Sequence, residues 1–415
     1  MSSPTTSTNP LILGSNIAII ALWAACQVVH IPYVVNLLVL VTSILYVACH
    51  NSLILREEQA LSRGEKDPND TSPPKDNEDR PRVDTLKTED AMQFPLLGSA
   101  SLFSLYLAFK FFDKEVVNLI ISGYFGLVGC AALTATTAPL FEKILPSAIT
   151  SVRFTKEIKI KHPLPEFIAG ESPWDFSFDM SLSDVLALIA SAVFSGVYLK
   201  TKHWTLNNVL GISFCLQGIE RFSLGTYKIG AILLIGLFFY DIFWVFGTEV
   251  MVTVAKNVDG PIKILFPRSL IPNAETGKLE LSLLGLGDIV IPGFFLALLL
   301  RFDAHNAKVP YFPTNVHYSF PKPYFHSALV AYVLGLGVTM FVMIYFEAAQ
   351  PALLYLVPAC LGSSLLCAMM RGEMKELFAY SEEEEEEEDE GKEKKEGEVK
   401  KETTDQKEEV AKKDD

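Results

Sequence analysis

The sequence predicts an all-α polytopic membrane protein with about nine transmembrane helices. Half of its 415 residues are hydrophobic, and the mean hydropathy is +0.28. The apolar residues gather in blocks of about 17–25 residues separated by polar loops, and a helix needs about 20 such residues to cross a bilayer. A soluble globular protein of this length would instead distribute its apolar residues in short periodic patches.

The N-terminal block, residues 1–54, carries the first predicted span. Its apolar stretch from Leu11 to Leu53 contains no acidic residue, lysine or arginine. The stretch is either two closely linked helices or one span at about 33–53 preceded by an interfacial or cleaved segment. Because residues 1–10 contain no basic residue, a cleaved secretory signal is the less favoured interpretation.

A polar loop at 55–92 separates this block from the remaining spans. The region 93–228 should hold spans two to five with a long loop at 141–182, in which the stretch VRFTKEIKI alternates like a short strand. The fifth span is the most polar, which predicts that it faces other helices rather than lipid. The region 229–371 should hold spans six to nine. The nine spans are expected at about 33–53, 94–112, 116–140, 183–199, 204–221, 229–248, 281–300, 327–346 and 351–370.

Residues 372–415 are predicted to form a disordered, solvated tail. From Ser381 onward there are 18 acidic residues and 8 lysines, so this segment carries −10 of the net charge of −14. A segment of this composition cannot bury enough apolar surface to fold. The acidity of the chain therefore resides in its tail and does not indicate a nucleic-acid partner.

Two of the predicted spans each contain a single acidic residue well inside an apolar run, Asp241 in FFYDIFWVFG and Asp288 in LSLLGLGDIVIPG. A charged side chain at the centre of a bilayer costs about 2.5–3.5 kcal/mol on insertion scales, so these residues are expected to be functional. Asp241 lies eight residues before Glu249, and Asp288 lies eight residues after Glu280. Because consecutive spans are antiparallel, both carboxyl groups are expected about 12 Å from the same membrane face, where they can meet.

Two carboxyl groups in a shared low-dielectric site cannot both ionise, so one proton should be held between them. This arrangement suits peptide hydrolysis: the ionised group takes a proton from the attacking water, and the protonated group donates to the developing oxyanion. Gly285 and Gly287 would allow close approach to Asp288, and Tyr240 brings a hydroxyl group that needs a partner. Proton or cation transport is the alternative, because buried acids also serve pumps and transporters.

A third element is expected on the same membrane face. Counting the crossings places residues 347–351 beside the loop 249–280, where the sequence continues Gln350-Pro351-Ala352-Leu353. Proline is tolerated at the start of a helix because the N–H it lacks has no partner there. Irregular backbone at this point would leave unpaired groups that can bind an extended substrate strand.

These motifs resemble those of the signal peptide peptidase family of intramembrane aspartyl proteases, which is related to the presenilins. The matching segments occur in the family's order: Tyr240-Asp241, Gly285-Leu286-Gly287-Asp288 and Gln350-Pro351-Ala352-Leu353. The resemblance implies a presenilin-like aspartyl protease fold of nine spans and catalysis by Asp241 and Asp288. It further implies that Pro351, Ala352 and Leu353 support the active site and the substrate, with no metal or organic cofactor.

The resemblance also implies substrates and a location. The substrates would be transmembrane helices of type II orientation, chiefly leftover signal peptides, in the membrane of the endoplasmic reticulum. The N-terminus would be luminal and the C-terminus cytosolic. A homo-oligomer and membrane proteins of quality control in the endoplasmic reticulum are compatible partners. Lys412 and Lys413 resemble a dilysine retrieval signal, which is read by a receptor.

The six cysteines lie within or at the ends of apolar blocks, without a CxxC pair or the spacing of metal ligands. They are predicted to be buried small hydrophobic residues.

Overall fold

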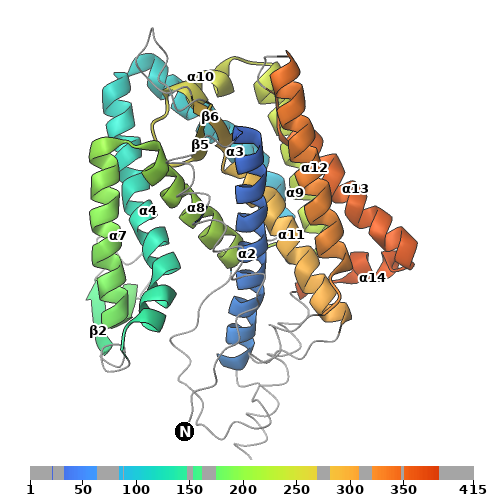
Figure 1. Cartoon of the computed structure of the whole chain (residues 1–415), viewed down its shortest axis with the longest axis horizontal. Coiled ribbons are helices and arrows are strands. Elements are labelled where there is room, and N and C mark those ends of the chain that lie inside the picture. The colour runs from blue at the N-terminus through green and yellow to red at the C-terminus, as the bar shows by residue number, and fades with distance from the viewer. Residues whose placement is uncertain are drawn as a thin grey trace, which may run out of the picture.

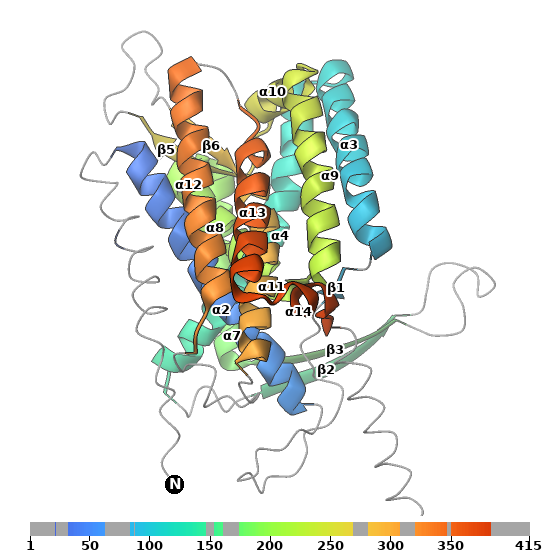
Figure 2. The same ribbon diagram turned by 90° about the vertical axis from the view of Figure 1, so that its right-hand side faces the viewer.

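The computed structural model is a bundle of long helices with three short two-stranded sheets (Figures 1 and 2). It describes residues 21, 32–62, 84–86, 88–146, 153–160, 174–268, 281–307, 320–346 and 350–382. The long helices in these ranges are α2 (Tyr33–Ser62), α3 (Thr88–Phe111), α4 (Lys114–Ile144), α7 (Leu182–Thr201), α8 (Trp204–Arg221), α9 (Tyr227–Phe246), α11 (Gly287–Asn306), α12 (Pro323–Phe346) and α13 (Leu353–Arg371). The predicted all-α architecture is therefore confirmed.

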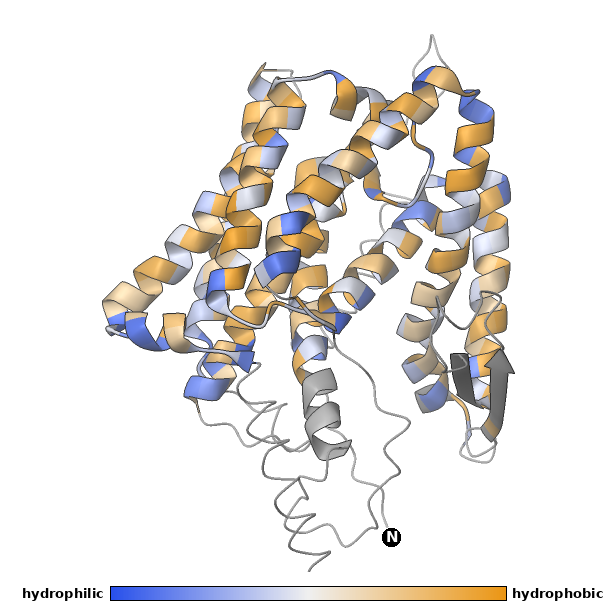
Figure 3. Cartoon of the chain, turned by 180° about the vertical axis from the view of Figure 1, so that it is seen from behind, coloured by the Kyte–Doolittle hydropathy of each residue, from blue (hydrophilic) through white to orange (hydrophobic). Residues whose placement is uncertain are grey.

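Seven of these helices are long and apolar enough to cross a membrane: α2, α3, α4, α7, α9, α12 and α13. The helices are coloured largely orange in Figure 3, and many of their large apolar side chains are exposed. The other two long helices, α8 and α11, are buried along much of their length. Every residue of α11 from Pro292 to Ala304 is buried. The multi-pass character is thus confirmed, and the total of nine crossings stays a prediction.

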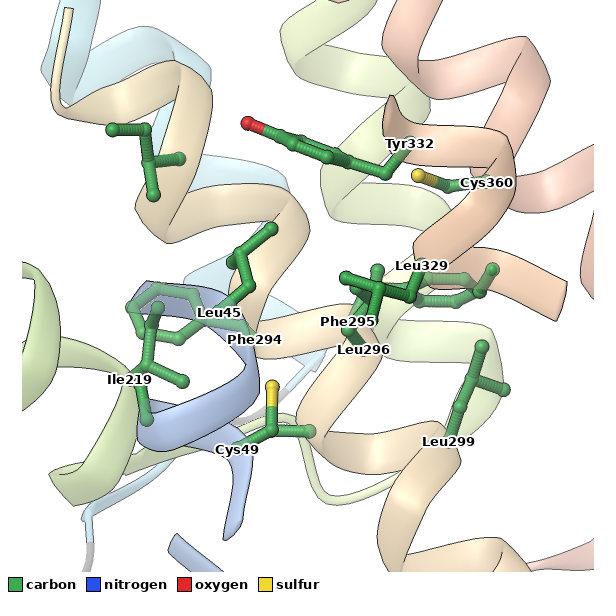
Figure 4. Packing of buried hydrophobic residues seen from close by; sticks show 14 of the residues in the cluster. Leu45, Cys49, Ile219, Phe294, Phe295, Leu296, Leu299, Leu329, Tyr332 and Cys360 are labelled. Carbon is green, nitrogen blue, oxygen red and sulfur yellow. The ribbon is translucent and has the colours of Figure 1, made fainter. Parts of the chain in front are cut away.

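Helix α11 forms the centre of the core and packs against α2, α8, α9, α12 and α13. Figure 4 shows Phe294 and Phe295 of α11 among side chains from its neighbours, including Leu45 and Ile219. Helices α8 and α11 approach closely at Gly293, where an added Cβ atom would lie 2.4 Å from Cδ1 of Ile219. A larger residue at this crossing would therefore require Ile219 to shift.

Two antiparallel hairpins interrupt the helices. Strand β2 (Arg153–Ile160) pairs with β3 (Trp174–Ser181) between α4 and α7, which confirms the strand predicted at VRFTKEIKI. After the short helix α10 (Val250–Asn257), strand β5 (Lys263–Pro267) pairs with β6 (Leu281–Gly285). Strands β5 and β6 lie in the part of the bundle nearest α10 (Figure 1).

The β6 strand corrects the predicted start of the seventh span. A helix over 281–300 was expected, but Leu281–Gly285 is extended and α11 begins at Gly287. Two causes account for this difference. Glycine is a poor helix former, and β5 provides a partner for the backbone of the preceding residues.

The end of the described chain corrects the predicted start of the tail. Residues 374–379 form helix α14 (Met374–Ala379), and Ser381 then bridges to Thr226. The next residue, Glu382, is fully buried and its Oε1 atom lies 2.6 Å from Nε of Arg301. The chain is therefore folded through Glu382, because the buried guanidinium group requires a counter-charge. The rest of the predicted tail lies outside the described residues.

In the described part of the chain, Cys49, Cys215 and Cys360 are buried free thiols, as predicted. Cys130 and Cys367 are only partly buried, and Cys26 lies outside the described residues. Strands β1 (Asp84–Thr85) and β4 (Phe222–Ser223) form a short parallel pair that ties the entry of α3 to the α8–α9 connection.

Candidate active site

Asp241 lies in the second half of α9, whose first turn is capped by the side chain of Thr226. Only 3% of Asp241 is exposed, so its carboxyl group requires a polar partner within the protein. The backbone N–H of Leu353 donates to its Oδ2 atom at 3.0 Å. Leu353 is the first residue of α13, where backbone N–H groups have no acceptor within their own helix. This hydrogen bond thus gives a partner to the Asp241 carboxyl group and to the Leu353 N–H, and it joins α9 to the start of α13.

Asp288 lies in the first turn of α11 and is half-buried. Helices α9 and α11 pack against each other, so the two aspartates predicted to meet lie within electrostatic range of one another. The backbone that leads to Asp288 differs from the prediction. Asp288 follows an extended strand rather than two turns of helix, so the depth inferred from helical rise does not apply to it.

The two glycines before Asp288 differ in their surroundings. A Cβ atom added at Gly285 would lie 3.3 Å from Oδ2 of Asp288, whereas one at Gly287 would meet only Cδ1 of Ile291, at 3.8 Å. Gly285 therefore allows the strand to pass close to the carboxyl group, and Gly287 is exposed. The predicted close approach is made at the first of the two glycines.

Tyr332 of α12 is a site residue that sequence reasoning missed. Its side chain is fully buried, and its hydroxyl group donates to the backbone carbonyl of Asp288 at 2.9 Å. Figure 4 shows this tyrosine beside Cys360 of α13. A signal was present, because a tyrosine hydroxyl inside an apolar span needs a partner.

Tyr240 is directed toward α3 rather than toward the carboxyl pair. A Cβ atom added at Gly98 would lie 3.8 Å from the Tyr240 hydroxyl oxygen. The ring centroids of Tyr240 and Trp244 are 6.3 Å apart. Trp244 in turn donates from Nε1 to Oγ of Ser99 at 3.1 Å. Tyr240 and Trp244 together hold α9 against α3, which fixes the helix that carries Asp241.

The predicted third element lies against the carboxyl pair. Pro351, Ala352 and Leu353 are all buried, and α13 begins at Leu353. The carbonyl of Pro351 accepts from Leu354 N–H at 3.3 Å, and that of Ala352 from Leu356 N–H at 3.1 Å. The proline therefore precedes the helix without removing any of its hydrogen bonds.

Strand β5 is anchored by Lys263 at its first position. The ammonium group donates to the carbonyls of Ala255, at 2.8 Å, and Val258, at 3.0 Å, so it caps the C-terminal end of α10. Burial lowers the pKa of Lys263, and the nearby Asp259 carboxylate opposes this shift. Two carbonyl acceptors and that carboxylate favour the charged ammonium form at this position.

The predicted retrieval signal and possible metal ligands are features other than the carboxyl pair. Lys412 and Lys413 lie outside the described residues. Among the residues that the structure does describe, no three histidine, cysteine, aspartate or glutamate side chains are placed to hold a metal ion.

The fold and the site together define a multi-pass helical membrane protein with two interacting aspartates at its centre. A family model described as signal peptide peptidase matches residues 78–384. The chain is 41% identical over 304 residues to the signal peptide peptidase of Homo sapiens, which covers 72% of this chain and 74% of that protein. The corresponding protein of Mus musculus is 42% identical over the same shares.

A third relative, intramembrane protease 2 of Caenorhabditis elegans, is 47% identical over 218 residues, covering 51% of this chain and 46% of that protein. The chain belongs to the signal peptide peptidase family. It is an intramembrane protease.

Proposed function

We propose that this chain is an aspartic endopeptidase that hydrolyses peptide bonds inside membrane helices with Asp241 and Asp288 as its catalytic pair. The observation that carries the proposal is that α9 and α11, which hold Asp241 and Asp288, pack against each other and bring the two carboxyl groups within electrostatic range. One carboxyl group in its ionised form takes a proton from water as that water attacks the peptide carbonyl. The other, protonated, donates to the oxyanion that forms.

The hydrogen bond from Leu353 to Asp241 supports this assignment. It occupies Oδ2 and holds the carboxyl group in one orientation, which leaves Oδ1 to face water or the partner aspartate. On the other side, the Tyr332 hydroxyl holds the backbone of Asp288. The Asp241 carboxyl group and the Asp288 backbone are therefore held before substrate binds, and such preorganisation is a main source of catalytic rate.

The substrate class follows from the position of the site. We infer that the substrates are single transmembrane helices of type II orientation, chiefly signal peptides left in the membrane, because the carboxyl pair lies between membrane-spanning helices and signal peptide peptidases are relatives of this chain. A peptide bond inside a helix is shielded, so the substrate must unwind locally. Strand β6 runs directly into Asp288, and an unwound segment can add to it as a strand.

The test is cleavage of a signal-peptide helix by detergent-purified protein, comparing the unchanged chain with Asp241→Ala and Asp288→Ala. We expect product only from the unchanged chain, and inhibition by a transition-state analogue of aspartic proteases. Ser99→Ala serves as a matched control, since it changes a buried contact of α9 beside Trp244 rather than a carboxyl group. Cleavage near the original rate by either aspartate variant would exclude the pair.

Proton- or cation-coupled transport remains the alternative use of the same two carboxyl groups. The same preparations, reconstituted into liposomes, distinguish the two functions. Ion flux that depends on Asp241 and Asp288, without cleavage by any form, would favour transport.

We further propose that the protein resides in the endoplasmic reticulum with a luminal N-terminus and a cytosolic C-terminus, where Lys412 and Lys413 can be read as a retrieval signal. The support is the pair Lys412-Lys413, which resembles a dilysine signal. Microscopy of the full chain beside markers of the endoplasmic reticulum and the Golgi tests this location, and residence in the Golgi would contradict it.

A further inference from the structure

Two asparagines of α8 bind the backbone of β5. Nδ2 of Asn208 donates to the carbonyl of Leu265 at 2.7 Å, and the N–H of Leu265 donates to Oδ1 of Asn208 at 2.8 Å. Nδ2 of Asn207 donates to the carbonyl of Lys263 at 2.7 Å. Both asparagines are buried, each with 4% exposed. Helix α8 packs against α2, α4 and α11, as predicted, and its two asparagines in addition bind a strand.

The side-chain amide of Asn208 occupies the place that a neighbouring strand would take. In an antiparallel pair, successive residues direct their backbone groups to opposite edges. The groups of Leu265 point to α8, so those of Ile264 and Phe266 point to β6. One edge of β5 is therefore filled by Asn207 and Asn208, and the other by β6.

The same alternation identifies the remaining edge of the hairpin. Leu284 and Ser282 are the partners of Ile264 and Phe266, so their backbone groups face β5. The backbone groups of Leu281, Leu283 and Gly285 must then face away from β5. Gly285 also lies near the Asp288 carboxyl group, since an added Cβ atom there would be 3.3 Å from Oδ2 of Asp288. A substrate strand added at this edge would thus run toward the carboxyl pair.

The asparagines are themselves held in place. The Tyr198 hydroxyl of α7 donates to Oδ1 of Asn207 at 3.2 Å, so the chain of contacts runs from α7 through α8 to β5. One turn further along α8, a Cβ atom added at Gly211 would lie 3.4 Å from Cδ2 of Leu286 and 3.7 Å from the carbonyl oxygen of Pro261. Helix α8 therefore contacts the segment before β5 and the residue that follows β6.

We propose that Asn208, assisted by Asn207, is a positioning residue that fixes the position of β6 relative to the carboxyl pair. By doing so it selects which peptide bond of the substrate is cleaved. The inference rests on the proposed aspartic mechanism and on strand addition at β6. The physical reason is that a strand has a period of two residues, so a displaced edge presents a different peptide bond to the carboxyl pair.

The experiment maps the cleavage sites of one signal-peptide substrate by mass spectrometry, using the full-length protein and three variants. Asn208→Leu keeps a similar volume and removes both hydrogen bonds to Leu265. Asn208→Asp keeps the acceptor and loses the amide donor. Gln217→Leu is the matched control, because Gln217 lies on the same helix and bonds only to Glu220 and Arg221 in the described contacts.

We expect Asn208→Leu to spread cleavage over neighbouring bonds, with kcat at the original bond lowered by about tenfold and KM changed much less. Asn208→Asp should give a smaller spread, and Gln217→Leu should give the original product pattern. The product ratio does not depend on the amount of folded enzyme, so partial misfolding cannot imitate the effect.

Unchanged cleavage sites in both Asn208 variants would overturn the inference, as would complete loss of product in both, since a positioning residue leaves cleavage at displaced bonds. Failure of the aspartic mechanism gives a different result. In that case Asp241→Ala and Asp288→Ala keep their activity, whatever the Asn208 variants do.

Discussion

Asp241 and Leu353 are separated by 112 residues and joined by one hydrogen bond of 3.0 Å. The two aspartates could be found from the sequence because each is a lone charge in an apolar run, and such a charge has few purposes inside a bilayer. The contacts that orient them could not be found in this way. A buried tyrosine such as Tyr332 signals that its hydroxyl group needs a partner but not which partner. The N–H of Leu353 is a backbone group, which leaves no pattern in the residue types.

Gly285→Ala tests the close approach at the site. The added methyl group would lie 3.3 Å from Oδ2 of Asp288, so the strand or the carboxyl group must shift by a few tenths of an ångström. We expect cleavage to fall by about tenfold, because a displacement of 1 Å can cost about a hundredfold. Initial rates on a signal-peptide helix measure the effect.

Gly337→Ala is the matched control for this change, since an added Cβ atom there has no neighbour within 4 Å. Equal activity of the two alanine variants would show that Gly285 has no special role.

At the scale of elements, helix α11 and the β5–β6 hairpin show why the sequence does not predict where the seventh span begins. The run Leu281–Leu284 is apolar, and a short apolar run cannot be assigned to helix or strand by periodicity alone. Its partner β5 is 14 residues away at the nearest, between Pro267 and Leu281. The pairing therefore depends on a contact between segments that the local sequence does not reveal.

Pro351→Ala tests the start of α13. Proline fixes φ just before the helix that presents the Leu353 N–H to Asp241, and alanine would allow that segment other conformations. We expect a loss of activity of several-fold, with little change in the unfolding temperature, measured on the same purified sample.

Pro358→Ala provides the comparison for this prediction. Pro358 lies inside α13 and is exposed, so it has no direct contact with the carboxyl pair. Full activity of Pro351→Ala would reduce the role of this segment to packing.

At the scale of the whole molecule, a buried cluster around Arg301 joins four distant segments. Its guanidinium group donates to Oε1 of Glu382 at 2.6 Å, to Ser52 of α2 at 2.8 Å and to Ser223 of β4 at 3.1 Å. The sequence suggested only that Arg301 flanks a span. Its partner was not predictable, because Glu382 is the first of seven consecutive glutamates and nothing in that run distinguishes it.

Removing one member of this cluster should destabilise the fold strongly. We expect Glu382→Ala or Arg301→Met to lower the free energy of unfolding by about 3–5 kcal/mol, since each leaves a buried charge unpaired. The double variant Arg301→Met, Glu382→Leu should lose much less. Thermal unfolding in detergent measures the order of the variants.

Arg371→Ala is the control for that comparison. Its ion pair with Glu373 is 45% exposed on the arginine side, and a pair of this kind contributes about 0–1 kcal/mol. Equal stability of all these variants would mean that the buried pair does not hold the C-terminal segment.

The Arg301 cluster also imposes an order in time on the synthesis of the chain. Arg301 leaves the ribosome 81 residues before Glu382, an interval of about 4–16 s at the usual rate of about 5–20 residues per second. During this interval the arginine has its hydroxyl partners but no counter-charge. The bundle therefore cannot reach its final stability until the first glutamate of the acidic run has been added.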